Sequence, residues 1–171
     1  MAETLILVNG LPGSGKTTLS RQLGSELGVP VVSKDDLKEA FADITGELVP
    51  SGRLGQIASE TMWELAAAMP GWVIVESWWF RPRDLAYVLA GIAKSGQPAV
   101  MEIWCDVPPD LAWQRYAARV RHPIHPDGQA ARAPWAEWMA NPIPLSIGHV
   151  TSVDTSGPVN VALLAERVRT S

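Results

Sequence analysis

The feature that most constrains this chain is a glycine-rich segment near its start, Gly10-Leu-Pro-Gly-Ser-Gly-Lys-Thr17. The segment matches the pattern G-x-x-x-x-G-K-[ST]. It lies between a short apolar run, Leu5 to Val8, and a stretch with helically spaced leucines, Thr17 to Leu27. A strand, a glycine turn and the start of a helix form the context that this motif needs. The sequence therefore predicts a loop that binds phosphate groups.

The residue types of this phosphate loop (residues 10–17) suit a nucleotide. Glycines let backbone N–H groups approach a phosphate without a Cβ clash, and the helix N-terminus adds partial positive charge. Lys16 is expected to neutralise the β and γ phosphates, and the Thr17 hydroxyl to hold Mg²⁺. The predicted cofactors are thus ATP and Mg²⁺. The expected nucleotide contacts are Gly10, Pro12, Gly13, Ser14, Gly15, Lys16, Thr17 and Thr18.

Two other interpretations of the glycines are weaker. A dinucleotide-binding turn is excluded, because the spacing differs from G-x-G-x-x-G and the Lys-Thr pair has no purpose there. The alternative is an ordinary turn followed by a solvated lysine. A turn alone gives no reason for a lysine at this position, because the N-terminal end of a helix repels cations.

Length and charge limit the number of domains and the kind of partner. The chain has 171 residues, a length that fits one domain over residues 1–171. Its 14 Lys and Arg against 18 Asp and Glu give a net charge of −4. An acidic balance argues against nucleic acid as a partner, because such binding relies on Lys and Arg. We expect no membrane span and no signal peptide. Cys105 is the only cysteine, which excludes an intrachain disulfide and fits a cytoplasmic location.

Short apolar strands alternate with amphipathic helices along the rest of the chain. Strands are expected at 5–8, 31–32, 72–75, 99–104 and 149–153, and helices at 17–27, 35–42, 54–69, 83–94, 109–120, 135–139 and 159–169. The stretch 122–134 is rich in proline and is expected to be a loop. This alternation predicts an α/β fold, in which a five-stranded parallel sheet has helices on both faces.

A second polar segment, Ser33 to Lys38, follows the expected second strand. Ligands bind at the carboxyl ends of the strands of an open parallel sheet, so we expect this segment on the same side as the phosphate loop. Asp35 could accept a proton from an acceptor hydroxyl, and Lys38, one helical turn later, could bind the acceptor. On the local sequence alone, Asp35 and Asp36 would also suit helix capping.

The two segments together resemble a known family. G-L-P-G-S-G-K-T followed after about fifteen residues by S-K-D-D-L-K is similar to the small P-loop kinases of the polynucleotide kinase, chloramphenicol phosphotransferase and zeta toxin group, which are AAA-like ATPases. The resemblance implies a P-loop NTPase three-layer sandwich with strand order 2-3-1-4-5. It also implies that Asp35 is the general base and that Lys38 stands where polynucleotide kinases usually have Arg.

The resemblance continues at Glu76, which ends the third expected strand. In the family, an apolar strand there ends in Asp-Thr or a similar pair, so Glu76 is a candidate for organising Mg²⁺ through water or for holding substrate. This chain has Glu for Asp, followed by Trp78, Trp79 and Phe80 where polynucleotide kinases tend to have a polar Asn. These differences argue against a polynucleotide acceptor.

A lid is implied by Arg115 and Arg119, which resemble the family's R-x-x-x-R segment. Four residues apart on a helix, they would share one face, and guanidinium groups suit adenine stacking and phosphate contact. The alternative is a solvated basic helix end. The lid region is expected over about 115–134. Within it, His122, His125 and Asp127 offer too few ligands for a metal site.

Eight tryptophans stand beside only two Phe and two Tyr. The strand and helix-face positions Trp72, Trp104 and Trp113 are expected in the core. Trp78 and Trp79 follow a strand at the ligand-binding edge, and adjacent side chains point to opposite sides, so at least one should line the cleft. Trp135 and Trp138 could form a second aromatic wall.

These expectations combine into an ATP- and Mg²⁺-dependent kinase that phosphorylates a hydroxyl of a small molecule, such as an antibiotic, a sugar or a nucleoside-like compound. The expected catalytic residues are Lys16, Asp35, Arg115 and Arg119. The expected acceptor contacts are Asp35, Lys38, Arg53, Glu76, Trp78 and Trp79. Two alternatives stay open: a polynucleotide or nucleoside 5′-kinase in which Lys38 and Arg53 grip a substrate phosphate, and a toxin-like or regulatory ATP-binding module.

Overall fold

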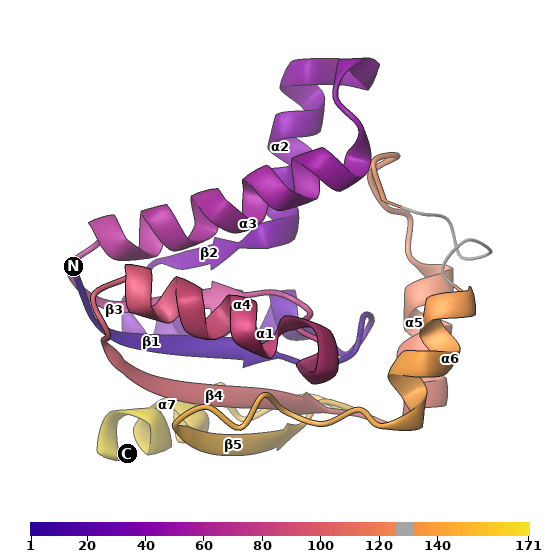
Figure 1. Ribbon diagram of the computed structural model, residues 1–171. Helices are drawn as coiled ribbons and strands as arrows, with labels where there is room; N and C mark the ends of the chain where they lie inside the picture. The colour runs from indigo at the N-terminus through magenta and orange to yellow at the C-terminus, as the bar shows by residue number, and fades with distance from the viewer. Residues whose placement is uncertain (126–131) are drawn as a thin grey trace.

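The computed structural model describes residues 1–125 and 132–171, so part of the expected lid, including Asp127, lies outside the described residues. The elements are β1 (Ala2–Asn9), α1 (Lys16–Leu27), β2 (Val31–Ser33), α2 (Lys34–Thr45), η1 (Gly46–Leu48), α3 (Ser51–Ala68), β3 (Gly71–Glu76), α4 (Arg81–Lys94), β4 (Ala99–Asp106), α5 (Pro109–Ala118), α6 (Arg132–Ala140), β5 (His149–Asp154) and α7 (Val161–Thr170). The strands form one parallel sheet in the order β2-β3-β1-β4-β5 (Figure 1). The expected α/β fold and strand order are confirmed.

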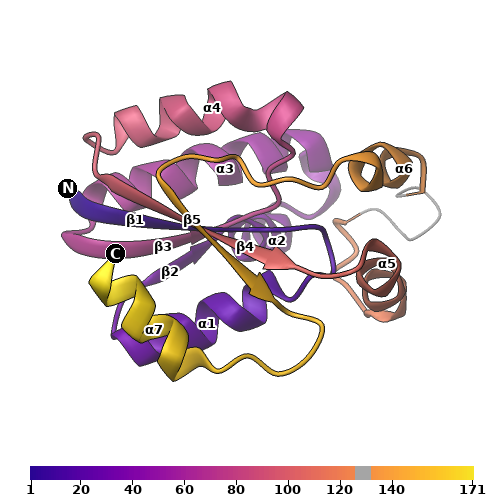
Figure 2. The same ribbon diagram turned by 90° about the horizontal axis from the view of Figure 1, so that it is seen from below.

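Helices cover both faces of the sheet. Figure 2 shows α3 and α4 on one face and α1 and α7 on the other. The central strand β1 contributes to both layers, because alternate side chains of a strand point to opposite faces. Leu5 and Leu7 pack with α3 and α4, whereas Ile6 and Val8 pack with α1 and α7. Burial on both faces explains why β1 is a continuous apolar run.

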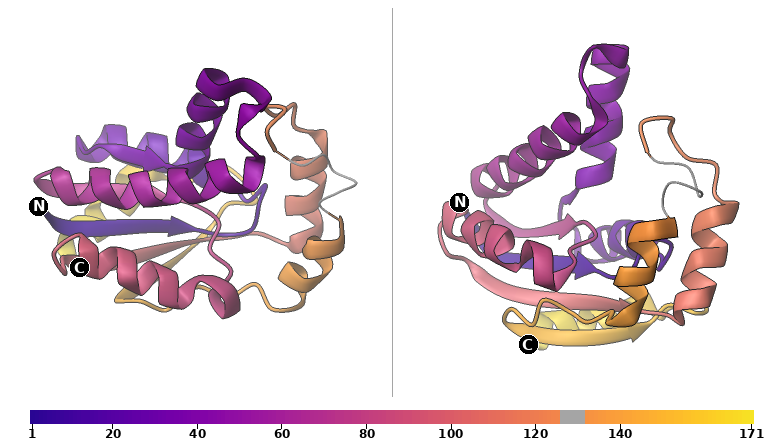
Figure 3. Two further views of the ribbon diagram at one scale, coloured as in Figure 1. Left: turned by 45° about the horizontal axis from the view of Figure 1, so that its top comes forward. Right: turned by 45° about the vertical axis from the view of Figure 1, so that its right-hand side comes forward.

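The carboxyl ends of the strands face α5 and α6, which stand side by side beyond that edge of the sheet (Figure 3). A third small core joins these two helices to the phosphate loop, with Leu11, Ala112, Tyr116 and Trp135 among its buried members. The phosphate loop and the start of α2 lie at the same edge. The fold therefore gathers the two predicted functional segments in one place.

Several element bounds differ from the expected ones. α5 ends at Ala118 rather than Val120, because Arg119 adopts an extended backbone conformation (φ −80°, ψ 128°). α6 begins at Arg132, inside the stretch expected to be a loop, and the short 3-10 helix η1 was not expected. Within residues 1–125 and 132–171, no helix combines the length and apolar character needed to cross a membrane.

Candidate active site

The phosphate loop joins β1 to α1 and lies directly against α5. Gly10, Gly13 and Gly15 have positive φ angles of 149°, 82° and 91°. A Cβ on Gly13 would collide with the carbonyl oxygen of Ala112 in α5. Glycine is therefore required at position 13 by both the backbone conformation and the available space.

The Lys16 ammonium is buried and is held by neutral groups of the loop. It donates hydrogen bonds to the carbonyl oxygens of Gly10 at 2.9 Å and Leu11 at 3.0 Å. Burial lowers the pKa of Lys16, and the nearby Glu76 acts in the opposite direction. Because carbonyl oxygens carry no formal charge, a bound anion would complete the neutralisation of this buried cation.

Thr17 and Glu76 supply oxygen atoms beside Lys16. The Thr17 hydroxyl donates to Oε2 of Glu76 at 3.3 Å, and Glu76 is buried at the end of β3. Burial raises the pKa of Glu76, although Lys16 favours its ionised form. A hydroxyl and a carboxylate are the hard oxygen ligands that Mg²⁺ uses together with phosphate oxygens, so the donor set fits Mg²⁺. The described part of the chain holds no group of three or more His, Cys, Asp or Glu placed to bind a metal.

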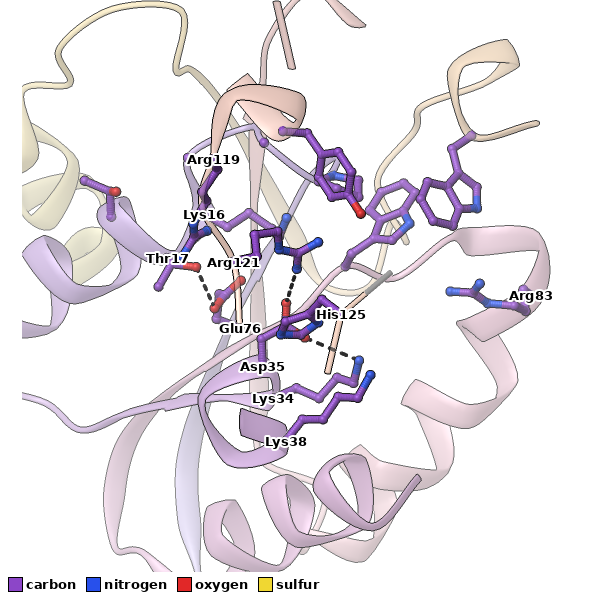
Figure 4. Close-up of a pocket in the computed structure, with 17 residues that line it drawn as sticks. Lys16, Thr17, Lys34, Asp35, Lys38, Glu76, Arg83, Arg119, Arg121 and His125 are labelled. Atoms are coloured by element: carbon purple, nitrogen blue, oxygen red, sulfur yellow. Dashed lines mark hydrogen bonds and ion pairs between the residues drawn. The ribbon is translucent and has the colours of Figure 1, made fainter. Parts of the chain in front are cut away.

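Asp35 faces the phosphate loop across a cavity of about 300 Å³ (Figure 4). Its side chain is 47% exposed, with Nζ of Lys34 at 3.5 Å from Oδ1 and Nη2 of Arg121 at 3.5 Å from Oδ2. Burial by itself would raise the pKa of Asp35, but Lys34, His125 and Arg121 outweigh it and hold that pKa below its usual value. Asp35 is therefore ionised at neutral pH.

The neighbouring Asp36 has a different environment. The cap of α2 is Ser33, whose hydroxyl accepts a hydrogen bond from the Asp36 backbone N–H at 3.4 Å, so the capping expected of Asp35 or Asp36 is corrected. The Asp36 carboxylate forms an exposed ion pair with Arg21 of α1 at 2.9 Å. Of the two carboxylates, only Asp35 lines the cavity.

The cavity is strongly cationic within an acidic chain. The loop and α1 contribute Pro12, Gly13, Gly15, Lys16, Thr17 and Thr18, whereas Gly10 and Ser14 do not line it. Its charged side chains are Lys16, Lys34, Lys38, Arg83, Arg119 and Arg121 against Asp35 and Glu76. An excess of positive charge in a confined space attracts anionic ligands.

Arg115 lies in a second cavity of about 360 Å³ rather than beside Asp35. Its guanidinium group donates to the carbonyl oxygens of Thr155 at 2.8 Å and Ser156 at 2.7 Å. Gly15 and Thr18 line both cavities, so Arg115 stays near the predicted nucleotide site. The expectation that Arg115 acts beside Arg119 at the reacting groups is corrected, because α5 ends before Arg119 and the two side chains enter different cavities.

Trp78 and Trp79 point to opposite sides of the chain, as their adjacency predicts. Trp78 lines the cavity, and its ring packs edge-on against the ring of Trp138, with 5.8 Å between the two ring centroids. Trp79 is 4% exposed and stacks on Trp63 of α3, with 6.2 Å between the two ring centroids. The expectation that Trp79 contacts an acceptor is therefore corrected: it is a core residue beneath α3.

The remaining tryptophans differ in how deeply they are buried. Trp104 is buried as expected, whereas Trp72 and Trp113 are partly buried at the margins of two cores. Trp135 of α6 is buried against α5, so of the second expected wall only Trp138 lines the cavity.

Arg53 does not reach the cavity. It is exposed on α3 and donates to Oε1 of Gln56 at 3.2 Å, so the substrate contact expected of Arg53 is corrected. Because α3 begins at Ser51, its first turn directs Arg53 to solvent. Lys38, by contrast, lines the cavity.

The segment 121–125 brings residues to the site that were not assigned to it from sequence. Arg121 pairs with Asp35, and the His125 Nε2 lies 2.8 Å from Oε1 of Glu39 in α2. Burial lowers the pKa of His125, although Asp35 and Glu39 act in the opposite direction. Arg121 also lies over the Tyr116 ring, 4.9 Å from its centroid. The sequence signal for this group was the expected lid over 115–134, which includes both Arg121 and His125.

Comparisons with known proteins agree with this architecture. A crystal structure from Chloroflexus aurantiacus J-10-fl, described as that of a candidate kinase, is 28% identical and covers 98% of this chain and 97% of its own, with a TM-score of 0.82. A gluconokinase from Sinorhizobium meliloti 1021 shares the fold at 15% identity and a TM-score of 0.58, covering 98% of this chain and 94% of its own.

The curated relatives in sequence are longer than this chain. An uncharacterized protein of Mycobacterium tuberculosis (strain ATCC 25618 / H37Rv) is 28% identical over 169 residues, which cover 90% of this chain and 32% of that protein. The chain thus spans about a third of the length of the curated relatives it matches. A family model, described as AAA domain (AAA_33), matches residues 5–141. The resemblance to P-loop kinases is confirmed, and the chain belongs to the AAA_33 family of AAA domains.

Proposed function

We propose that this protein is an ATP- and Mg²⁺-dependent phosphotransferase that moves the γ-phosphoryl group of ATP to a hydroxyl of a small molecule. The observation that carries the proposal is an ionised carboxylate, Asp35, in the same cavity as the buried Lys16 of the phosphate loop. A base facing a phosphate-binding lysine is the arrangement that activates a hydroxyl for phosphoryl transfer. The similarity to a structure described as a candidate kinase supports the proposal.

The proposed nucleotide site is divided between the two cavities. The phosphates of ATP contact the loop and Lys16, and the nucleoside lies toward the cavity that contains Arg115 and Thr18. Thr17 and Glu76 would hold Mg²⁺, which neutralises part of the phosphate charge when bound. Arg119 and Arg121 supply further positive charge to the transferring group.

Asp35 performs the proposed proton transfer. It accepts the proton of the acceptor hydroxyl while a bond forms between the acceptor oxygen and the γ-phosphorus. The bond from the γ-phosphorus to the β–γ bridging oxygen breaks, and ADP leaves with that electron pair. The proton then passes from Asp35 to solvent. The cations around Asp35 keep it ionised and ready for the next cycle.

The acceptor is proposed to be small because of the space beside Asp35. A cavity of about 300 Å³ lies at the lower end of the range for small-molecule sites. We further propose that residues 1–171 act as one domain, with the region 115–134 as a lid that limits the access of water to the γ-phosphate.

The test is ADP formation by the purified chain with Mg²⁺, ATP and a panel of hydroxyl-bearing compounds, with mass spectrometry of each acceptor. We expect ADP formation that depends on the acceptor, together with a phosphorylated product, and loss of both in Lys16→Met. A rate of ATP hydrolysis that no acceptor changes would instead support a regulatory ATP-binding module. Phosphorylation of oligonucleotide ends alone would support the polynucleotide kinase alternative.

A further inference from the structure

Two lysine side chains converge at the end of the cavity away from the phosphate loop. Lys34 and Lys38 lie on one face of α2, because they are four positions apart in the helix, and both line the cavity. Figure 4 shows their amino groups together beyond Asp35. Lys38 is only 8% exposed. Burial lowers the pKa of Lys38, and repulsion from the nearby Lys34 ammonium lowers it further, whereas Asp35 and Glu39 act in the opposite direction.

Among the described residues, Lys38 forms no ion pair, and the carboxylates that act on its charge are Asp35 and Glu39, of which Glu39 contacts His125. Nζ of Lys34 lies 3.5 Å from Asp35, a carboxylate that Arg121 also contacts. Nζ of Lys38 donates to the Ser51 hydroxyl at 2.8 Å, and that hydroxyl donates to the carbonyl oxygen of Ile124. Ser51 therefore orients Lys38 without supplying negative charge. An anion beside both ammonium groups would relieve their repulsion.

The phosphates of ATP do not account for the Lys34–Lys38 pair. Lys16 and Arg119 lie on the phosphate-loop side of Asp35, whereas the pair lies on the other side (Figure 4). The acceptor hydroxyl has to reach Asp35, so another part of the same molecule would extend to the two lysines. Arg83 also lines the cavity, but it offers less positive charge to an anion than the two lysines do, because its guanidinium donates two hydrogen bonds of 2.7 Å to the Asp84 carboxylate.

We propose that the acceptor is a small anion: a hydroxyl-bearing molecule whose carboxylate or phosphate group lies between Lys34 and Lys38 while its hydroxyl faces Asp35. This inference rests on the proposed kinase function and names its substrate class. The rings of Trp78 and Trp138, which line the same cavity, would lie against the carbon skeleton of the acceptor.

Matched acceptors test the charge requirement. For polyols of three to six carbons, the rate of ADP formation is compared among the polyol, the acid derived from it and its monophosphate. We expect the acid or the monophosphate to exceed the neutral polyol in kcat/KM by about 10-fold or more, the size of a charged hydrogen bond. The acid and monophosphate arms distinguish a carboxylate from a phosphate. Equal kcat/KM for the neutral polyol would overturn the inference.

Variants locate the requirement at the two lysines. The double variant Lys34→Met with Lys38→Met should lose the preference for the anion by about 10- to 100-fold while the KM for ATP stays within about twofold. Lys38→Arg should restore part of the preference, because it keeps the charge. Lys94→Met on α4 is the matched control, since Lys94 is an exposed lysine paired with Glu64 outside the cavity. An unchanged preference in a folded double variant would contradict the assignment.

A binding measurement separates this inference from the kinase proposal. With Mg²⁺ and a non-hydrolysable ATP analogue filling the phosphate loop, inorganic phosphate and malonate are titrated calorimetrically into the wild-type chain and the variants. We expect one anion per chain in the wild type and in Lys94→Met, and none in the double variant. No binding to the wild type would overturn the anion site. Binding without phosphoryl transfer to any acceptor would instead contradict the kinase function, and the anion would then be a ligand only.

Discussion

Asp35 and Asp36 are adjacent carboxylates in opposite environments, and this contrast gives a matched pair of variants. Asp35→Asn should keep ATP binding and lower the kcat of phosphoryl transfer by about 10² to 10⁴, the range for loss of a positioned base. Asp36→Asn should change kcat little, because the exposed pair of Asp36 with Arg21 contributes little. Because the reaction needs the ionised base, the wild-type rate should fall with acid only below the usual pKa of an aspartate.

The measurement is kcat and the Kd for ATP of each variant over a range of pH. A larger loss of kcat in Asp36→Asn than in Asp35→Asn would move the base assignment by one residue.

Trp78 and Trp79 give a second matched pair. Trp78→Ala should raise the KM for the acceptor about 5- to 150-fold, through loss of about 1 to 3 kcal/mol of ring contact, and leave the KM for ATP nearly unchanged. Trp79→Ala removes a core ring stacked on Trp63, at about 3 to 5 kcal/mol of stability, so its Tm should fall by about 6 to 20 °C.

Both KM values and the Tm of each variant are measured together. If Trp78→Ala lost thermal stability with no effect on the acceptor, Trp78 would be a packing residue instead of a wall of the acceptor site.

The end of α5 determines where the two arginines of the expected lid, Arg115 and Arg119, lie. The spacing of Arg115 and Arg119 predicts a shared face only if the helix continues through both residues. The sequence has no Gly or Pro between Arg119 and Arg121 to mark the stop, so the extended conformation at Arg119 was not predictable from local residues. Arg115 therefore bonds the loop after β5, whereas Arg119 lines the Asp35 cavity.

A buried glutamate ties another segment to the sheet. Glu102 of β4 accepts hydrogen bonds from the backbone N–H groups of Leu145 and Ser146, each at 2.8 Å, and from the Asn9 side chain at 3.3 Å. The Oδ1 of Asn9 accepts from the Gly10 backbone N–H at 2.8 Å. Glu102 thus connects the segment between α6 and β5 to the first residue of the phosphate loop.

This connection predicts that Glu102→Gln is destabilising. The amide has no charge and presents an N–H₂ group to backbone donors, so about 1.5 to 3 kcal/mol should be lost, with a fall in Tm of about 3 to 12 °C. Glu166→Gln on the exposed side of α7 makes the same chemical change and should leave the Tm within about 2 °C. Scanning calorimetry compares the two variants. An equal Tm for both would show that Glu102 does not anchor the segment.

The overall fold could be predicted from the sequence more fully than the candidate site could. The alternation of strands and helices predicts the parallel sheet, and the phosphate loop marks one ligand-binding edge, because both are local patterns. The cationic cavity was not predictable, since Lys34, Arg83 and Arg121 come from three separate segments of an acidic chain. Trp79 and Arg53 were misassigned for a similar reason: burial depends on how α3 packs on the sheet.

Nucleotide binding should stabilise the whole chain. At 100 times its Kd, ATP with Mg²⁺ should add about 2.7 kcal/mol to the free energy of unfolding, a rise in Tm of about 5 to 11 °C. Lys16→Ala should abolish this rise, because it removes the buried cation of the phosphate loop, whereas Lys94→Ala should keep it. Thermal unfolding with and without the nucleotide measures the effect. The same rise in Lys16→Ala would contradict the assignment of the loop.

The proposed transfer of the γ-phosphoryl group from ATP to an acceptor hydroxyl can be followed directly by ³¹P NMR. The spectrum of a reaction with ATP, Mg²⁺ and an anionic hydroxyl compound should show ADP and a new phosphate monoester with the wild-type chain, and neither with Asp35→Asn. Inorganic phosphate as the only product, at a rate that the acceptors and Asp35→Asn leave unchanged, would contradict phosphoryl transfer to an acceptor.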